Sequence, residues 1–156
     1  MLDQLTKWLT AAYLHGREAL VLIPGFLEFT YVENRGAAFG MLQGARWIFI
    51  VFTGAVMVGL LAMLLFSKYR RFTLFNIGAV LTAAGGLGNL IDRIFRGYVV
   101  DMIHVFWRTV GFDFPVFNFA DCCVVVGSIV LLIFFFFFYD ENKLTAEERH
   151  GNRTQG

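Results

Sequence analysis

Charged residues are scarce in this chain of 156 residues. Only 16% of its residues are Asp, Glu, Lys or Arg, whereas a soluble domain usually carries about 25%. The 13 cations and 12 anions leave a net charge of +1, which gives no indication of a nucleic-acid partner. The only two cysteines are adjacent, at Cys122 and Cys123, so they cannot form a CxxC metal or redox pair. We interpret them as small buried apolar residues, and we expect no metal and no cofactor.

The chain contains long apolar runs instead. Residues 47–66, 72–91 and 122–139 contain no charged side chain. Because about 20 helical residues cross the hydrocarbon layer of a bilayer, each run predicts a membrane-spanning helix.

The N-terminal segment 2–14 is also apolar and helical in pattern, yet it carries Asp3 and Lys7. At about 1.5 Å per residue, a helix of this length crosses roughly two-thirds of a bilayer. We therefore expect either an incomplete span lying against the other helices, or further apolar residues before Met1 in the natural protein. Charges at this depth are tolerated when other helices supply partners for them.

The polar segments divide the chain into extramembrane parts. Residues 15–46 contain GFLEFTYVEN, whose aromatic and β-branched residues predict a short strand and hence a small sheet-like cradle. An outer loop is expected at 92–120. The mixed-charge tail at 140–156 lacks apolar periodicity and is expected to be frayed. Its neighbour, the phenylalanine run 134–138, is interpreted as a lipid-facing or bundle-packing surface.

The short sequence SKYRR at 67–71 places three cations between two predicted spans. A dense basic loop of this kind is typical of the cytoplasmic side, so the cradle, the outer loop and the end of the span at 72–91 should face the other side.

The resulting prediction is an all-α membrane protein formed by one domain, residues 1–156. Its architecture is a four-helix transmembrane bundle with a small β-cradle.

Polar residues gather near the outer ends of two predicted spans. Asp101 and Asp121 can meet at one membrane face, because the end of one helix lies beside the start of its antiparallel neighbour. Two close carboxyl groups tend to share one proton, so one can take a proton from water while the other donates to a carbonyl oxygen. Asn118 is a plausible N-cap for the last span. Asp121 then lies at a helix N-terminus, which favours its anion, and Asp101 is expected to be the weaker acid.

The same residues are compatible with different roles. Asp92 and Arg93 could form an ordinary ion pair at a helix end. The acids could line a proton pathway in a small proton-coupled transporter, or they could be incidental to a structural membrane protein. His104 is better explained by interfacial packing than by proton shuttling.

Four blocks of the sequence resemble one known family. They are DQLTK at 3–7, NRGAAFG at 34–40, GNLIDRIFRGYVVD at 88–101 and FNFAD at 117–121. In this order, and with this membrane topology, they resemble the lipoprotein signal peptidases (signal peptidase II) of bacteria over nearly the whole chain.

The resemblance implies a multi-pass aspartic endopeptidase of the bacterial inner membrane, with a periplasmic β-cradle and an active site toward the outer face. It implies cleavage of diacylglyceryl-modified prolipoproteins just before the lipidated cysteine, by a monomer in contact with membrane lipid. Asp101 and Asp121 would be the catalytic pair. The residues that would order the site or bind substrate are Asn34, Arg35, Asn89, Asp92, Arg93 and Asn118.

Overall fold

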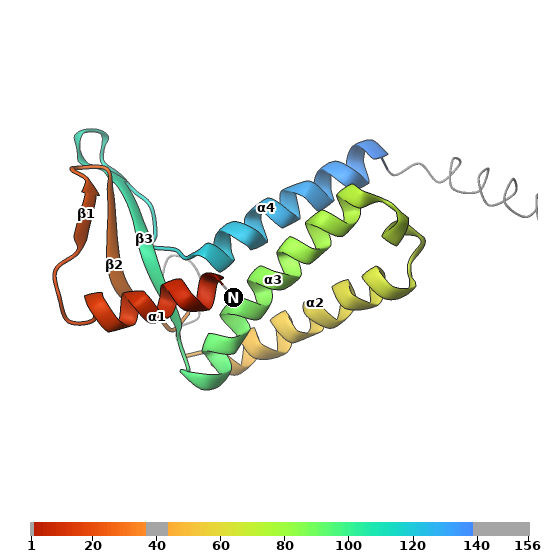
Figure 1. Ribbon diagram of the computed structural model, residues 1–156, viewed down its shortest axis with the longest axis horizontal. Coiled ribbons are helices and arrows are strands. Elements are labelled where there is room, and N and C mark those ends of the chain that lie inside the picture. The colour runs from red at the N-terminus through yellow and green to blue at the C-terminus, as the bar shows by residue number, and fades with distance from the viewer. Residues whose placement is uncertain (1, 37–43, 139–156) are drawn as a thin grey trace, which may run out of the picture.

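A computed structural model of the chain describes residues 2–36 and 44–138 (Figure 1). The expected tail at 140–156, residue 139 and the AAFG part of the NRGAAFG block lie outside the described residues. In chain order, the helices and strands are α1 (Leu2–Leu14), β1 (Leu20–Ile23), β2 (Leu27–Asn34), α2 (Arg46–Phe66), α3 (Thr73–Phe95), β3 (Val99–Trp107), β4 (Phe112–Asp113) and α4 (Phe119–Ile133). Short 3-10 turns at Lys68–Arg71 and Arg108–Val110 connect some of them, and a π-helical turn at Phe134–Phe138 extends α4.

Three helices in the described part of the chain are long and apolar enough to cross a membrane: Arg46–Phe66, Thr73–Phe95 and Phe119–Phe138. They correspond to the three charge-free runs of the sequence. The main difference is at the end of α3, which continues to Phe95 instead of ending at residue 91. Asp92 and Arg93 therefore lie on its last turns, and not in the loop that follows.

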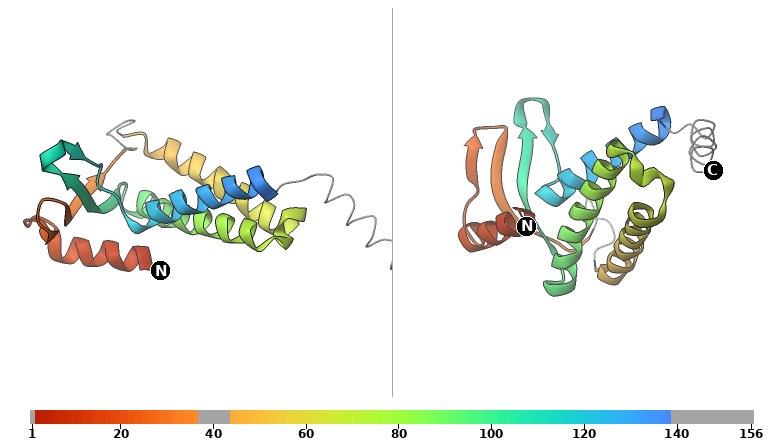
Figure 2. Two further views of the ribbon diagram at one scale, coloured as in Figure 1. Left: turned by 90° about the horizontal axis from the view of Figure 1, so that it is seen from above. Right: turned by 45° about the vertical axis from the view of Figure 1, so that its right-hand side comes forward.

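The predicted four-helix transmembrane bundle is confirmed only as these three candidate spans. α1 has 13 residues, fewer than the roughly 20 that a crossing needs. Figure 2 shows α1 beside the sheet, with its N-terminal end next to α3. It packs against β2 and β3 and touches α3 and α4.

Small residues allow α3 and α4 to pack closely. A Cβ atom on Gly85 would collide with the backbone carbonyl oxygen of Ala120, and one on Gly127 would lie 2.5 Å from Thr82 Oγ1. Lipid tails are as apolar as leucine, so helix association in a membrane depends on such close van der Waals contact. This packing fixes the start of α4 beside the end of α3.

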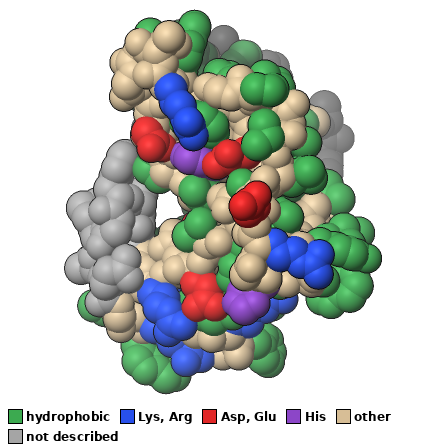
Figure 3. Space-filling model, turned by 90° about the vertical axis from the view of Figure 1, so that its left-hand side faces the viewer, with side chains coloured by type: hydrophobic (Ala, Val, Ile, Leu, Met, Phe, Trp, Pro, Cys, Tyr) green, Lys and Arg blue, Asp and Glu red, His purple; other side chains and the backbone are tan. Residues whose placement is uncertain are grey.

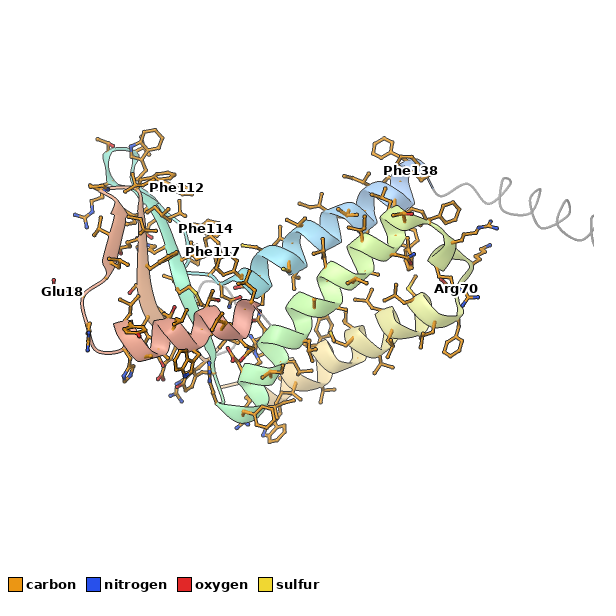
Figure 4. The ribbon with its side chains drawn as sticks, in the orientation of Figure 1. Glu18, Arg70, Phe112, Phe114, Phe117 and Phe138 are labelled. Carbon is orange, nitrogen blue, oxygen red and sulfur yellow. The ribbon has the colours of Figure 1, made fainter. Side chains whose placement is uncertain are left out.

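Aromatic residues close the end of the bundle that lies away from the sheet. Phe134 is 1% exposed and packs with Phe75, Ala79 and the surrounding rings. Phe136 and Phe137 are 80% and 79% exposed, so the phenylalanine run has one packing side and one outward side. Figure 4 shows Arg70, from the basic SKYRR loop, at this same end of the molecule, far from the sheet.

The sheet is antiparallel with the order β1-β2-β3-β4. The predicted strand in GFLEFTYVEN is confirmed as β2, but two further strands come from the segment 92–120, which we expected to be a loop. β3 lies at the middle of the sheet and carries Asp101 opposite Val32. A shift in the β2–β3 register between Phe29 and Val32 places an irregularity next to this residue, as is common beside functional sites.

Candidate active site

Asp101 lies in β3 with only 2% of its surface exposed. Asn34, at the end of β2, donates from Nδ2 to Asp101 Oδ2 at 2.9 Å. Asn118, just before α4, donates from Nδ2 to Asp101 Oδ1 at 2.6 Å. Both oxygens of this buried carboxyl group therefore accept a hydrogen bond from an amide side chain.

Asp121 lies in the first turn of α4, where it belongs to a capping box. Asn118 Oδ1 accepts from the backbone nitrogen of Asp121 at 3.0 Å, while Asp121 Oδ2 accepts from the backbone nitrogen of Asn118 at 3.0 Å. Asn89 of α3 donates to Asp121 Oδ1 at 2.7 Å. The predicted N-cap is confirmed, and the cap fixes the position of the Asp121 carboxylate.

Asn118 connects the two carboxyl groups that the sequence singled out. Its side-chain nitrogen binds Asp101, and its side-chain oxygen and backbone nitrogen bind the first turn of α4 at Asp121. It is fully buried, so this connection is shielded from water. The structure therefore brings Asp101 and Asp121 to opposite sides of one asparagine.

A second network surrounds the ammonium group of Lys7, whose side chain is 0% exposed. Lys7 Nζ lies 2.8 Å from Asn89 Oδ1, 2.9 Å from Asp3 Oδ2 and 3.1 Å from Asp92 Oδ2. The contact with Asn89 is a hydrogen bond, and the contacts with Asp3 and Asp92 are ion pairs. Lys7 of α1 is thus paired both with Asp3 of its own helix and with Asp92 of α3.

Asp92 is anchored from several sides. Besides Lys7, it accepts from Gln4 Nε2 at 3.2 Å, Arg96 Nη1 at 3.2 Å and the backbone nitrogen of Val100 at 3.2 Å. The simple Asp92–Arg93 ion pair that the sequence left open is not among its contacts in the described residues. Asp92 instead joins α1, the end of α3 and the start of β3.

Arg93 and Arg35 have different surroundings. Arg93 Nη2 donates to the carbonyl oxygen of Gly36 at 3.3 Å, and its guanidinium carbon lies 4.7 Å from the centre of the Phe49 ring. Arg35 forms an ion pair with Glu33 at 2.8 Å, and its side chain is 61% exposed. Among the predicted site residues, the three asparagines contact the carboxyl pair directly. Asp92 reaches Asn89 through Lys7, and Arg93 interacts electrostatically with both acids. The contacts of Arg35 lie elsewhere.

Burial dominates the electrostatics of Asp101. It disfavours the carboxylate and, with the nearby Asp121 charge, raises the pKa of Asp101 from 3.8 to about 6, against the opposing hydrogen bonds of Asn34 and Asn118. A carboxyl group with such a pKa can hold or release a proton near neutral pH. A buried acid beside a second carboxylate can perform acid–base hydrolysis.

Besides Asp3 and Lys7, Gln4 and Tyr98 make contacts in or beside this site that were not predicted from the sequence. Gln4 lies inside the DQLTK block, and it binds both Gly88 O and Asp92. Tyr98 lies inside the RGYVVD block and contacts Tyr31 and Arg35 from the other side of the strand pair. Their places inside the two blocks are the signal that could have identified them.

The remaining polar groups of the sheet lie farther from the carboxyl pair. His104 bridges Glu28 and Asp113 at the far end of the sheet, which agrees with a packing role. The described residues contain no group of three or more His, Cys, Asp or Glu placed to hold a metal ion.

The chain is similar to known proteins over most of its length. The family described as Signal peptidase (SPase) II matches residues 1–137. The lipoprotein signal peptidase of Symbiobacterium thermophilum is 41% identical over 124 residues, which cover 80% of this chain and 80% of that protein. The lipoprotein signal peptidase of Geobacillus thermodenitrificans is 44% identical over 124 residues, covering 77% of this chain and 73% of that protein.

Solved structures show the same similarity. A bacterial membrane enzyme determined at 2.3 Å by the in meso method gives a TM-score of 0.75 at 33% identity, covering 90% of this chain and 85% of that chain. A second bacterial membrane enzyme structure, determined at 1.9 Å by the same method, gives a TM-score of 0.75 at 34% identity. The match covers 87% of this chain and 86% of that chain. The chain therefore belongs to the signal peptidase II family.

Proposed function

We propose that the protein is a membrane aspartic endopeptidase that removes signal peptides from diacylglyceryl-modified prolipoproteins, cutting before the lipidated cysteine. The observation that carries this proposal is the pair of carboxyl groups held by Asn118, one from a strand and one from a helix N-terminus. Family membership supports lipoprotein processing, and the apolar helices support a membrane location.

Asp101 and Asp121 act together on a water molecule. Asp121 accepts the proton of the water, and the hydrogen bonds from Asn89 and the backbone of Asn118 hold its carboxylate in position. Asp101, whose burial raises its pKa to about 6, donates the shared proton to the scissile carbonyl oxygen as the water adds to the carbonyl carbon. When the adduct collapses, the C–N bond breaks, Asp121 passes its proton to the leaving amine nitrogen, and Asp101 takes its proton back. The remaining predicted residues, Asn34, Asn89, Asp92 and Arg93, hold the two acids in place.

The location of the pair matches the proposed substrate. A lipidated cysteine is anchored in the leaflet, so the scissile bond lies close to the membrane surface, and an acid pair must reach that depth. β3, which carries Asp101, and the start of α4, which carries Asp121, lie at the end of the molecule that holds the sheet (Figure 1). Arg70 lies at the opposite end of the bundle (Figure 4). With the basic loop in the cytoplasm, the active site faces the outer side of the inner membrane.

Cleavage of a synthetic diacylglyceryl lipopeptide by the purified protein in detergent, with EDTA present, tests the proposal. We expect one cut before the lipidated cysteine, and no cut in a matched peptide that lacks the lipid. Solute transport in proteoliposomes without any cleavage would favour a proton-coupled transporter that uses the same acids. Loss of cleavage on adding EDTA would refute the metal-independent mechanism.

A further inference from the structure

Four side chains where β2 ends and β3 begins form a ring of contacts, which we call the Glu33 ring: Tyr31, Glu33, Arg35 and Tyr98. Tyr31 Oη donates to Glu33 Oε1 at 3.2 Å and lies 3.3 Å from Tyr98 Oη. Arg35 binds the other oxygen of Glu33 at 2.8 Å, and its guanidinium carbon lies 5.2 Å from the centre of the Tyr98 ring. Each member therefore contacts two others.

The Glu33 ring lies on the face of the sheet opposite to Asp101. Side chains alternate between the two faces along a strand. Asn34 uses one face of β2 to bind Asp101, so its neighbours Glu33 and Arg35 lie on the other face. Figure 3, which views the molecule from the sheet end, shows charged and hydrophobic side chains side by side on that face.

The ring fastens the strand pair where its backbone pairing ends. The last paired residues of β2 and β3 are Asn34 and Val99. The next residues along the two chains, Arg35 and Tyr98, are in contact through their side chains. Strand ends with few remaining backbone contacts open most easily. The Asn34 amide, which must stay 2.9 Å from Asp101, lies at this end.

We propose that the Glu33 ring is a positioning device that holds the end of β2 against the start of β3 and so fixes the Asn34 amide on Asp101. Within the described residues, the hydrogen bonds to the Asp101 carboxyl group come from Asn34 and Asn118, so the ring acts through Asn34. The inference deepens the proposed function, and it rests on that function only for the role of Asp101 in cleavage.

The ring has an electrostatic consequence for Asp101. The Asn34 hydrogen bond favours the Asp101 anion and lowers its pKa against the effect of burial. The other charged groups that face Asp101 are Asp121 of α4, Lys7 of α1 and Arg93 of α3, and none of them belongs to the ring. A weaker hydrogen bond from Asn34 therefore raises the pKa of Asp101, while the charges of Asp121, Lys7 and Arg93 stay the same.

The size of the effect follows from the strength of that bond. Complete loss of a hydrogen bond to a charged group would raise the proton affinity of Asp101 by about 10- to 100-fold. A ring variant weakens the bond but does not remove it. We therefore expect a rise of about threefold in proton affinity, which moves the titration midpoint by roughly half a pH unit.

Two ring variants and one matched control test the inference. Glu33→Gln removes the ion pair with Arg35, and Tyr98→Phe removes only one hydroxyl group. The control Glu28→Gln alters an equally polar contact on the same two strands, since Glu28 binds His104 at 2.9 Å far from Asn34. Infrared titration of the purified protein in detergent follows the Asp101 carboxyl band, identified by its loss in Asp101→Asn.

We expect the titration midpoint of the Asp101 carboxyl band to rise in both ring variants and to stay unchanged in the control. The pH at which lipopeptide cleavage falls to half on the alkaline side should rise by a similar amount. An unchanged Asp101 midpoint in the ring variants, or an equal rise in Glu28→Gln, overturns the inference. If the wild type does not cleave the lipopeptide, the proposed function fails, while the infrared titration still decides whether the ring positions Asn34.

Discussion

Lys7 offers the sharpest test of how the site is held together. Its ammonium group is 0% exposed, and Asp92, one of its partners, is 1% exposed. Replacing Lys7 by methionine keeps most of the side-chain volume but leaves Asp3 and Asp92 buried without their shared cation. Breaking a buried ion pair by removing one partner costs about 3–5 kcal/mol. For a chain of this size, each kcal/mol lowers the Tm by about 2–4 °C, so Lys7→Met should lower the Tm by roughly 10 °C.

Thermal unfolding in detergent measures this loss. Lys68→Met is the matched control, because Lys68 is exposed on the short basic turn and exposed charges contribute little. The double variant Lys7→Met/Asp92→Asn removes a buried charge of each sign and should recover part of the stability. If Lys7→Met melts within about 2 °C of the wild type, the buried network does not stabilise the fold as its geometry indicates.

The remaining predictions concern the acids and the two arginines. Asp101→Asn and Asp121→Asn should each abolish lipopeptide cleavage while circular dichroism stays native, and substantial turnover in either variant would exclude the acid pair. Because burial raises the folded-state pKa of Asp101 from 3.8 to about 6, the native protein binds a proton more tightly than the unfolded chain. Its stability should therefore fall as pH rises through about 4–6, a slope in Tm that Asp101→Asn should reduce. Arg93→Ala should lower both the Tm and cleavage, because Arg93 contacts Gly36 and Phe49. Arg35→Ala should lower the Tm less, since its side chain is 61% exposed, and equal losses would contradict this division.

The helices could be predicted from the sequence because a bilayer leaves few alternatives. A long charge-free run must satisfy its backbone hydrogen bonds internally, and a helix does so within one segment. β3 was not predicted, although Val99, Val100, Ile103 and Val105 are β-branched residues that favour strands. Both faces of this strand are partly buried, so no clear alternation of apolar and polar residues marks it. Asp101 also interrupts the apolar pattern in the middle of the strand.

The part of the site that depends on local sequence could be predicted, whereas the part that depends on long-range contacts could not. Asn118 and Asp121 lie within one helical turn, so the capping pattern is local and readable. The network around Lys7 joins residues 82 positions apart, as in the bond to Asn89, and no local pattern encodes such a contact. Without the family resemblance, the charges of α1 would have remained unexplained.

The chemistry at position 118 explains why an asparagine stands there. Serine, threonine or aspartate could also cap α4, but an asparagine side chain offers one acceptor and two donor hydrogens at once. Asn118 uses all of them: Oδ1 accepts from the backbone of Asp121, while Nδ2 donates to Asp101 at 2.6 Å and to Asn89 Oδ1 at 3.2 Å. The same amide that starts the helix therefore binds one acid directly and the other through the cap.

The hydrogen bonds of the two carboxyl groups are distributed evenly. Among the described residues, each of the four oxygens accepts one hydrogen bond, from Asn34 and Asn118 at Asp101 and from Asn89 and Asn118 at Asp121. A carboxylate oxygen can accept about two such bonds, so every oxygen keeps a second lone pair. Networks that are satisfied in this way rigidify their members. The acids are thus held in place by one set of lone pairs, and in the proposed mechanism the other set binds the shared proton and the attacking water.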